Sequence, residues 1–200
     1  NRQPDLLEPV ERVEEPMRNK GKVAVMGLVL AACAYSFVQA PQVWSMGSRV
    51  PVVGVHAEDF RLTDLTGKEQ SLSQYRGKIV LVNFWATWCK PCTTEMPAMQ
   101  ASFDKLHDKG FVVVAVNELE DDARVREHIK QYGHTFPVLM DRDNKVANQF
   151  GVFGLPVSVF IDQEGRVQEY LKGGLLTEQK IEEIVARIQK NEPVKAAALR

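Results

Sequence analysis

The chain has 200 residues, with 25 lysines and arginines, 26 aspartates and glutamates, and a formal net charge of −1. This length allows one ordinary domain with some additional chain. The near balance of charge argues against a nucleic-acid partner that is bound by electrostatic attraction. Three cysteines in a chain of this length also exclude a mini-protein held together by disulfides.

The N-terminal part is predicted to lie outside the folded domain. The first sixteen residues contain five acids, two bases and three prolines, and residues 1–22 are interpreted as a disordered cytoplasmic segment. Residues 23–40, "VAVMGLVLAACAYSFVQA", form an uncharged run of 18 residues, close to the roughly 20 that cross a bilayer. Arg18, Lys20 and Lys22 precede the run, so the rest of the chain is predicted to lie outside the cytoplasm.

Three forms of attachment are open for residues 23–40. An uncleaved transmembrane anchor is favoured, because the apolar run continues well beyond Cys33. The sequence "LAAC", which ends at Cys33, resembles a bacterial lipobox and would make this cysteine a lipidated N-terminus. The third alternative is a signal peptide that begins at Met17 and is cleaved after Ala40, since basic residues precede the apolar run.

The remaining chain is divided into a linker at residues 41–56, a folded domain at 57–192 and a tail at 193–200. The domain is predicted to begin with a β-hairpin that turns at Thr66 and Gly67. Apolar runs and helical periodicity then predict a series of strands and helices. In chain order these are a strand at 79–85, a helix to about 109, a strand at 111–116, a helix at 121–132, a strand at 136–140, a short helix at 145–150, paired strands at 156–162 and 167–171, and a helix at 177–190. This order predicts an α/β domain with a central mixed sheet flanked by helices.

The segment "VNFWATWCKPCTTEMP", residues 82–97, places Cys89 where a strand ends and Cys92 one turn into the following helix. Residues three apart on a helix lie about 5–6 Å apart, within the range that a disulfide can bridge. A disulfide between them would add little to the stability of the fold, since closing so short a loop contributes only about 2 kcal/mol. Zinc would need four ligands, and neither a second cysteine pair nor suitably spaced histidines are present. A redox centre is therefore favoured over a structural disulfide and over half of a zinc site.

The placement of the pair also predicts its chemistry. A thiolate at a helix N-terminus is stabilised by free N–H groups and by the positive end of the helix dipole, and Lys90 adds a positive charge. Cys89 is predicted to be the exposed, attacking thiol. Cys92 is predicted to be the inner thiol that resolves the mixed disulfide.

The segments "NFWATWCKPCTTEMP" and "GVFGLPVSVFID" resemble the TlpA/ResA/CcmG group of bacterial, membrane-tethered thiol-disulfide oxidoreductases, and the resemblance extends over about residues 57–190. It implies a thioredoxin-like fold with an N-terminal hairpin and a central insert, and no cofactor or metal. It also implies a reducing role on the periplasmic side of the inner membrane, often in cytochrome c maturation. The implied partners are protein thiols and disulfides, such as apocytochrome c or an oxidase assembly factor, and an upstream membrane thiol reductant.

The resemblance also assigns roles to single residues. Cys89 and Cys92 match the redox-active pair, and Trp88, Leu155 and Pro156 match positions that contact the substrate, Pro156 as a cis-proline facing the disulfide. The resemblance further matches Glu95 to an acid that handles protons near the cysteines. The alternative for Glu95 is an acid in the first helical turn that only interacts with the helix dipole.

The cysteine pair is also compatible with two other functions. A copper-delivery protein could bind Cu(I) through Cys89, Cys92 and a nearby methionine or histidine, because soft thiolates select this ion. Copper-delivery proteins of similar fold, however, typically widen the cysteine spacing and add a distal histidine. A thiol peroxidase would be expected to carry a Pro-x-x-x-Thr-x-x segment before its cysteine, and the sequence has none.

Overall fold

A computed structural model describes residues 50–191 of the chain. The predicted cytoplasmic segment, the membrane or signal segment, most of the linker and the C-terminal tail lie outside the described residues. Between residues 50 and 191, no helix combines the length and the apolar composition that crossing a bilayer requires.

The described chain contains one mixed sheet of seven strands, in the order β2-β1-β5-β4-β3-β6-β7. Strands β3, β4 and β5 run parallel, while β1 and β6 join them in antiparallel pairing, as do β2 and β7 at the two edges. The predicted mixed sheet is therefore confirmed. The strands are β1 (Arg61–Asp64), β2 (Glu69–Ser71), β3 (Ile79–Trp85), β4 (Phe111–Glu118), β5 (Val138–Asp141), β6 (Val157–Ile161) and β7 (Val167–Lys172).

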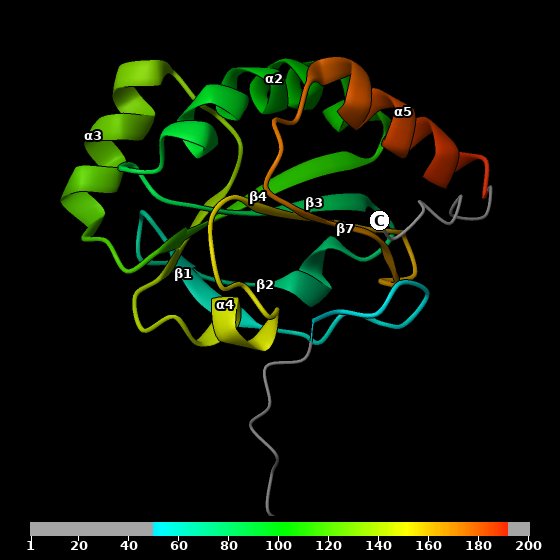
Figure 1. Cartoon of the computed structure of the whole chain (residues 1–200), viewed down its shortest axis with the longest axis horizontal. Helices are drawn as coiled ribbons and strands as arrows, with labels where there is room; N and C mark the ends of the chain where they lie inside the picture. Colours follow the sequence, from blue (N-terminus) through cyan, green and yellow to red (C-terminus); the bar gives the residue numbers. More distant parts are fainter. Residues whose placement is uncertain (1–49, 192–200) are drawn as a thin grey trace, which may run out of the picture. The chain divides into compact units, whose positions relative to one another are not determined.

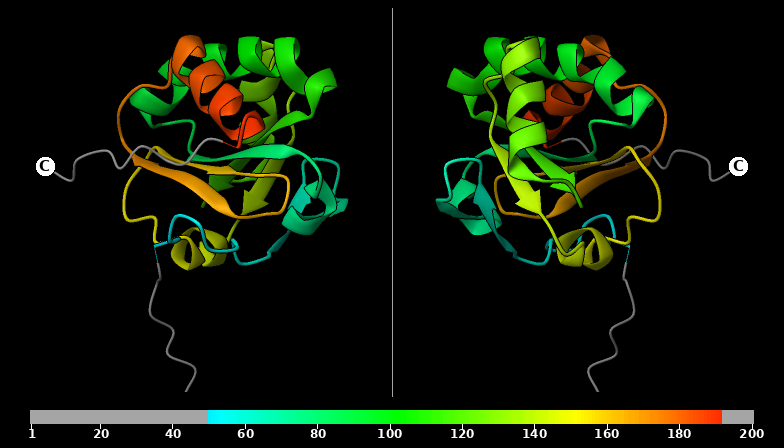
Figure 2. Two further views of the ribbon diagram at one scale, coloured as in Figure 1. Left: turned by 90° about the vertical axis from the view of Figure 1, so that its right-hand side faces the viewer. Right: turned by 90° about the vertical axis from the view of Figure 1, so that its left-hand side faces the viewer.

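Helices cover both faces of this sheet (Figure 1). Helices α2, α3 and α5 lie over one face, and the short helix α4 lies on the other, an arrangement that the side views in Figure 2 also show. The helices are α2 (Lys90–Leu106), α3 (Asp122–Tyr132), α4 (Lys145–Gln149) and α5 (Glu178–Gln189), with 3-10 turns η1 (Leu72–Tyr75) and η2 (His107–Lys109). Each helix predicted within residues 57–192 is present, with ends that differ from the prediction by a few residues.

The central strands explain why the sequence forms this layered structure. All seven residues of β3 are buried, and alternate side chains enter two separate cores because a strand directs successive side chains to opposite faces. Leu81 and Trp85 pack beneath α2 and α5, whereas Val82 and Phe84 pack on the face that α4 covers. Each fully buried aliphatic or aromatic side chain stabilises the fold by about 1.5–3 kcal/mol.

The folded domain begins earlier than the predicted boundary at residue 57. Gly54 N–H donates to the Val167 carbonyl at 2.7 Å, and Val167 N–H donates to the Val55 carbonyl at 2.9 Å. His56 forms an isolated bridge with Arg166. The end of the predicted linker therefore pairs with the chain at the start of β7, because the edge of this strand leaves backbone groups available for hydrogen bonding.

Two buried acids lie side by side where β4 and β5 end. Glu118 and Asp141 are register partners and are 8% and 0% exposed. Asp141 Oδ2 accepts a hydrogen bond from Ala147 N–H in α4, whereas Glu118 Oε1 and Asp141 Oδ1 have no hydrogen-bond partner among residues 50–191. Burial, and then the neighbouring Asp141 carboxylate, raises the pKa of Glu118 to about 7. Burial also raises the pKa of Asp141.

This acid pair predicts that the protein loses stability as the pH rises towards neutrality. The folded state holds the Glu118 proton up to about pH 7, whereas the ordinary pKa of the group is 4.5, so the folded state binds more protons in between. We expect the free energy of unfolding to fall by about 2 kcal/mol over this interval, after allowing for solvent screening. Glu118→Gln should weaken this dependence, since Asp141 keeps a raised pKa, and it should raise the free energy of unfolding at pH 8.

The measurement is urea unfolding of both proteins at several values between pH 5 and pH 8. Glu127→Gln, which changes an exposed glutamate on α3, serves as the matched control and should keep the wild-type slope. Equal pH slopes in the wild type and Glu118→Gln would contradict the proton-holding role of this pair.

Candidate active site

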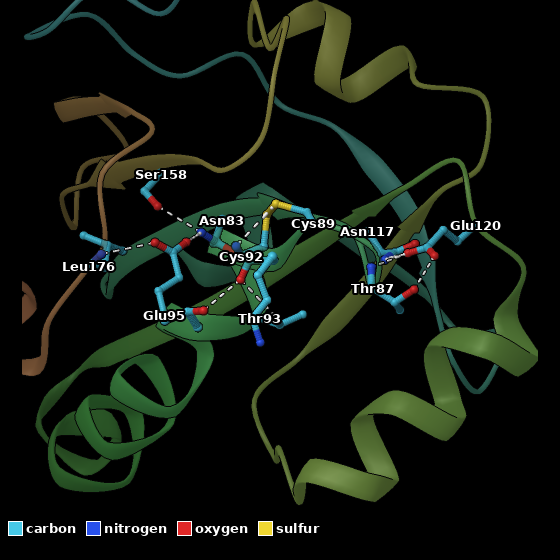
Figure 3. Close-up of a disulfide and its surroundings, with 12 residues drawn as sticks. Asn83, Thr87, Cys89, Cys92, Thr93, Glu95, Asn117, Glu120, Ser158 and Leu176 are labelled. Atoms are coloured by element: carbon cyan, nitrogen blue, oxygen red, sulfur yellow. Dashed lines mark hydrogen bonds between the residues drawn. A yellow bond between two sulfur atoms is a disulfide. The ribbon is translucent and has the colours of Figure 1, made fainter.

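Cys89 and Cys92 form a disulfide at the N-terminus of α2 (Figure 3), with 2.02 Å between the sulfurs and 5.3 Å between the Cα atoms. Strand β3 ends at Trp85, and the following loop leads to Cys89, which caps the helix. The Cys89 sulfur accepts a hydrogen bond from Cys92 N–H at 3.3 Å. Pro91 lies at the first turn, where the missing N–H leaves no helical hydrogen bond unmade. The predicted strand-to-helix placement of the pair is confirmed.

The two cysteines are less accessible than the sequence predicted. Cys92 is fully buried, as expected for the inner thiol, but Cys89 is only 5% exposed. The prediction of an exposed Cys89 is wrong for this oxidised state, because the residue packs into the core layer beneath α2 together with Trp85 and Met96. The neighbouring Trp88 is instead 66% exposed.

Glu95 lies in the second turn of α2, and no acid occupies the first turn. Its side chain is 1% exposed and turns into the core, where Oε1 accepts from Asn83 Nδ2 at 2.8 Å and Oε2 accepts from Leu176 N–H at 3.1 Å. The alternative of a helix-dipole acid in the first turn is therefore wrong. Both carboxylate oxygens are bonded to groups outside α2, because burial requires a partner for each of them.

The surroundings of Glu95 stabilise the protonated form of its carboxyl group, so that this group can hold or release a proton. Burial raises the pKa of Glu95, while the hydrogen bonds from Leu176 N–H and Asn83 act in the opposite direction. Figure 3 shows the carboxyl group on the same side of the helix start as Cys92. An acid that is buried next to a thiol disfavours a second negative charge there, so the two groups should titrate in a linked way.

A second buried carboxylate holds the loop that leads to the cysteines. Glu120 Oε2 accepts from Thr87 N–H at 2.7 Å, and Oε1 accepts from the Thr87 hydroxyl at 2.5 Å. Asn117 Nδ2 donates to the same carboxylate at 2.9 Å, and Arg124 Nε lies 3.4 Å from it. The Glu120 side chain is 5% exposed. These contacts join the end of β4 to the residue that precedes Trp88.

The chain segment before β6 lies at the same end of the sheet as the disulfide. The Leu155–Pro156 peptide bond is cis, as the resemblance implied, and Pro156 is buried. Register pairing of Phe84 with Val157 places this segment opposite the end of β3. Leu155 is partly buried against the core layer that contains both cysteines. Trp88, Cys89, Cys92, Leu155 and Pro156 therefore lie at the same end of the sheet, and Glu95 on α2 is turned into the core next to β3.

Sequence reasoning missed the residues that position this site. Asn83 is a polar residue in an otherwise apolar strand, and it also donates to the Ser158 hydroxyl at 2.9 Å. This break in an apolar run was the available signal for Asn83. Glu120 belongs to an acidic run after β4, which gave no indication of a contact with Thr87.

Within residues 50–191, no cluster of three or more His, Cys, Asp or Glu side chains is arranged to hold a metal ion. The sulfur atoms of Cys89 and Cys92 are bonded to each other, which is the oxidised state of the pair.

A cysteine pair at the start of a helix, next to a central parallel strand, is the arrangement of the thioredoxin-like oxidoreductases. A protein of this class from Chlorobium tepidum TLS, described as a thiol:disulfide interchange protein of the thioredoxin family, superimposes with a TM-score of 0.62 and 29% identity. The match covers 67% of this chain and 95% of the other. The predicted thioredoxin-like fold of the described domain is confirmed.

The chain matches the AhpC/TSA family over residues 53–170, more than half of its length, and it belongs to that family. The ResA thiol-disulfide oxidoreductase of Bacillus thuringiensis subsp. konkukian is 40% identical over 136 residues, which cover 68% of this chain and 78% of ResA. ResA of Geobacillus kaustophilus is 38% identical over 161 residues, covering 80% and 90% of the two chains. The protein is accordingly a thiol-disulfide oxidoreductase.

The buried position of Glu95 predicts that this residue controls thiol titration. In Glu95→Gln the negative charge beside Cys92 is removed, so the alkylation profile of the reduced protein should shift to lower pH by about one unit. We expect the protein to remain folded with a stability loss of about 1 kcal/mol, because the amide cannot accept hydrogen bonds at both positions.

The test is the rate of iodoacetamide alkylation of the reduced protein between pH 5 and pH 10. Glu183→Gln, an exposed glutamate on α5, is the control and should leave the profile unchanged. Superimposable curves for the wild type and Glu95→Gln would mean that Glu95 only supports the fold.

Proposed function

We propose that this protein reduces specific protein disulfides outside the cytoplasm, with Cys89 as the nucleophile and Cys92 as the resolving thiol. The observation that carries the proposal is the Cys89–Cys92 disulfide at the start of α2, with the buried Glu95 carboxyl group on the same helix and the exposed Trp88 directly before Cys89 in the chain. An accessible apolar side chain beside a protected thiol suits a polypeptide partner better than a small oxidant.

The reaction begins with the reduced dithiol. The Cys89 thiolate attacks one sulfur of the partner disulfide, which breaks, and the released sulfur leaves as a thiolate that takes up a proton. Cys92, after losing its proton, attacks the Cys89 sulfur and releases the second partner thiol. We propose that Glu95 accepts the Cys92 proton, and the burial that raises the pKa of its carboxyl group supports this role. Two electrons thereby pass to the partner, and the protein retains the Cys89–Cys92 disulfide.

The oxidised product must be reduced again before another turnover. We infer an upstream thiol reductant in the membrane as the source of these electrons. The basic residues that precede the uncharged run at 23–40 support a single-pass anchor in a bacterial inner membrane, with the catalytic domain on the periplasmic side. On the partner side, the proposal extends to apocytochrome c or an oxidase assembly factor, through the resemblance to the TlpA/ResA/CcmG group.

The assignment of the two thiols is tested by mixed-disulfide trapping. Cys92→Ser should accumulate a covalent complex with a disulfide-containing partner, because the neighbouring thiol that resolves the mixed disulfide is removed. Cys89→Ser should form none. The measurement is non-reducing electrophoresis of envelope extracts, followed by mass spectrometry of the trapped chains. If Cys92 is alkylated before Cys89 in the reduced protein, the assignment is reversed.

The same preparations separate the competing functions. A copper-delivery protein would retain copper in an amount equal to the protein after purification under reducing conditions, and a thiol peroxidase would turn over hydrogen peroxide with thiol consumption. For a protein-disulfide reductase we expect neither result.

The proposed anchoring predicts that the chain fractionates with membranes and that an added protease reaches the catalytic domain from the periplasmic side. Cys33→Ala distinguishes the two anchored forms: a spanning helix tolerates the change, whereas a lipoprotein loses its acyl group and its processing. The measurement combines carbonate extraction with mass spectrometry of the N-terminus. A mature chain found soluble in the periplasm would contradict both forms of anchor.

A further inference from the structure

Leu119 has an unfavourable backbone conformation and an unfavourable exposure at the same time. Its φ angle is 56°, and its side chain is 63% exposed. In the described part of the chain, the other residues with positive φ apart from glycines are Asn144 and Asn191, and asparagine tolerates the left-handed region far better than leucine does. A glycine at this position would remove the strain of the positive φ angle, and a polar residue would avoid exposing an apolar side chain to water. Residues held in this way cluster at functional sites.

The position of Leu119 is fixed by its neighbours. Leu119 N–H donates to the Asp141 carbonyl at 3.1 Å, so the turn is tied to the end of β5. The next residue, Glu120, accepts both hydrogen bonds from Thr87, which is followed by Trp88 and Cys89. Figure 3 shows Thr87 and Glu120 beside the cysteine pair. The Leu119 turn and the loop that carries the attacking cysteine are therefore held together by one buried carboxylate.

Three exposed apolar side chains stand on the loops at this end of the sheet. Trp88 is 66% exposed on the loop after β3, Leu119 is 63% exposed after β4, and Phe153 is 76% exposed on the segment before Pro156. The register between β3 and β4 and between β3 and β6 places these three loops at the same end of the central strands. We call these three side chains the apolar rim. Cys89 lies at this same end of the sheet, directly after Trp88 in the chain.

We propose that Leu119 is a specificity-determining residue, which contacts an apolar side chain next to the cysteine that the partner presents to Cys89. The inference rests on the proposed function and specifies its substrate class: an extended polypeptide segment with an apolar residue beside its disulfide cysteine. The position of Leu119 at the same end of the sheet as Cys89 supports a polypeptide segment as its binding partner. Exposed aromatic and aliphatic side chains around a reactive centre are typical of the anchors of protein interfaces.

The test uses two synthetic peptides, each with one intramolecular disulfide, that differ only in a leucine or a serine next to one cysteine. The full chain is reduced beforehand and freed of reductant, and one turnover is followed by tryptophan fluorescence. In each turnover two protein thiols become a disulfide and one peptide disulfide becomes two thiols. We expect the wild type to react about tenfold faster with the leucine peptide, and Leu119→Gly to lower that preference about fivefold.

Further variants separate contact from folding. Leu119→Asn removes the apolar side chain but tolerates the same backbone, and it should lower the preference as Leu119→Gly does. Leu119→Met should retain the preference. Asn144→Gly relaxes the same backbone conformation beyond β5 and should leave the preference unchanged. The melting temperature of Leu119→Gly should fall by no more than about 3 °C, since a mostly exposed side chain contributes little packing.

The possible failures are distinguishable. If the reduced wild type reacts with neither peptide while its thiols remain alkylatable, the proposed reduction of protein disulfides fails, and the role of Leu119 fails with it. If both peptides react and the preference is the same in the wild type, Leu119→Gly and Leu119→Asn, the proposed function stands and the inference about Leu119 is overturned. Equal rates of the wild type with the leucine and serine peptides would also overturn it.

Discussion

The burial of the Glu95 carboxyl group is the constraint on which the site depends. A charged or polar group that is removed from water costs free energy unless its hydrogen bonds are replaced. Here the replacement comes from Asn83 in β3 and from the backbone of Leu176 before α5. One side chain on α2 therefore fixes the cysteine-bearing helix against the central strand and against the segment that leads into α5.

A second acid, Glu120, fixes the loop on the N-terminal side of the cysteines. Glu120 holds Thr87 at the loop before the cysteines, while Glu95 lies one turn beyond them. Negative charge near a dithiol disfavours the thiolate form, whereas the helix N-terminus favours it. When the thiolates of the reduced pair are less stabilised, the pair gives up electrons more readily, because a stabilised reduced form makes a strong oxidant. The two carboxylates thus support the proposed reducing direction.

The end of β4 departs from ordinary folding rules over four consecutive residues. Asn117 Oδ1 is buried and has no hydrogen-bond partner in the described part of the chain, and Glu118 is a buried acid beside Asp141. Leu119 combines a positive φ angle with exposure, and the Glu120 side chain is a buried carboxylate. The neighbouring residues of β4 are all buried and apolar. Sequences agree with their fold at most positions and depart from it where function requires otherwise. This concentration of exceptions marks the β4 end as part of the functional region.

The sequence by itself determined the strands, the helices and the cysteine pair, because these depend on local periodicity and on a spacing of three residues. The apolar run of β3, the helical pattern of α5 and the position of Cys89 at a helix start were all predicted correctly. Only the tertiary structure decided which partners the buried acids have. Asn83 lies 12 residues from Glu95 and 75 from Ser158, and Leu176 N–H comes from 81 residues beyond Glu95. Contacts between residues so distant in the chain leave no periodic signal, and the burial of Cys89 was missed for the same reason: it depends on how α2 packs against the sheet.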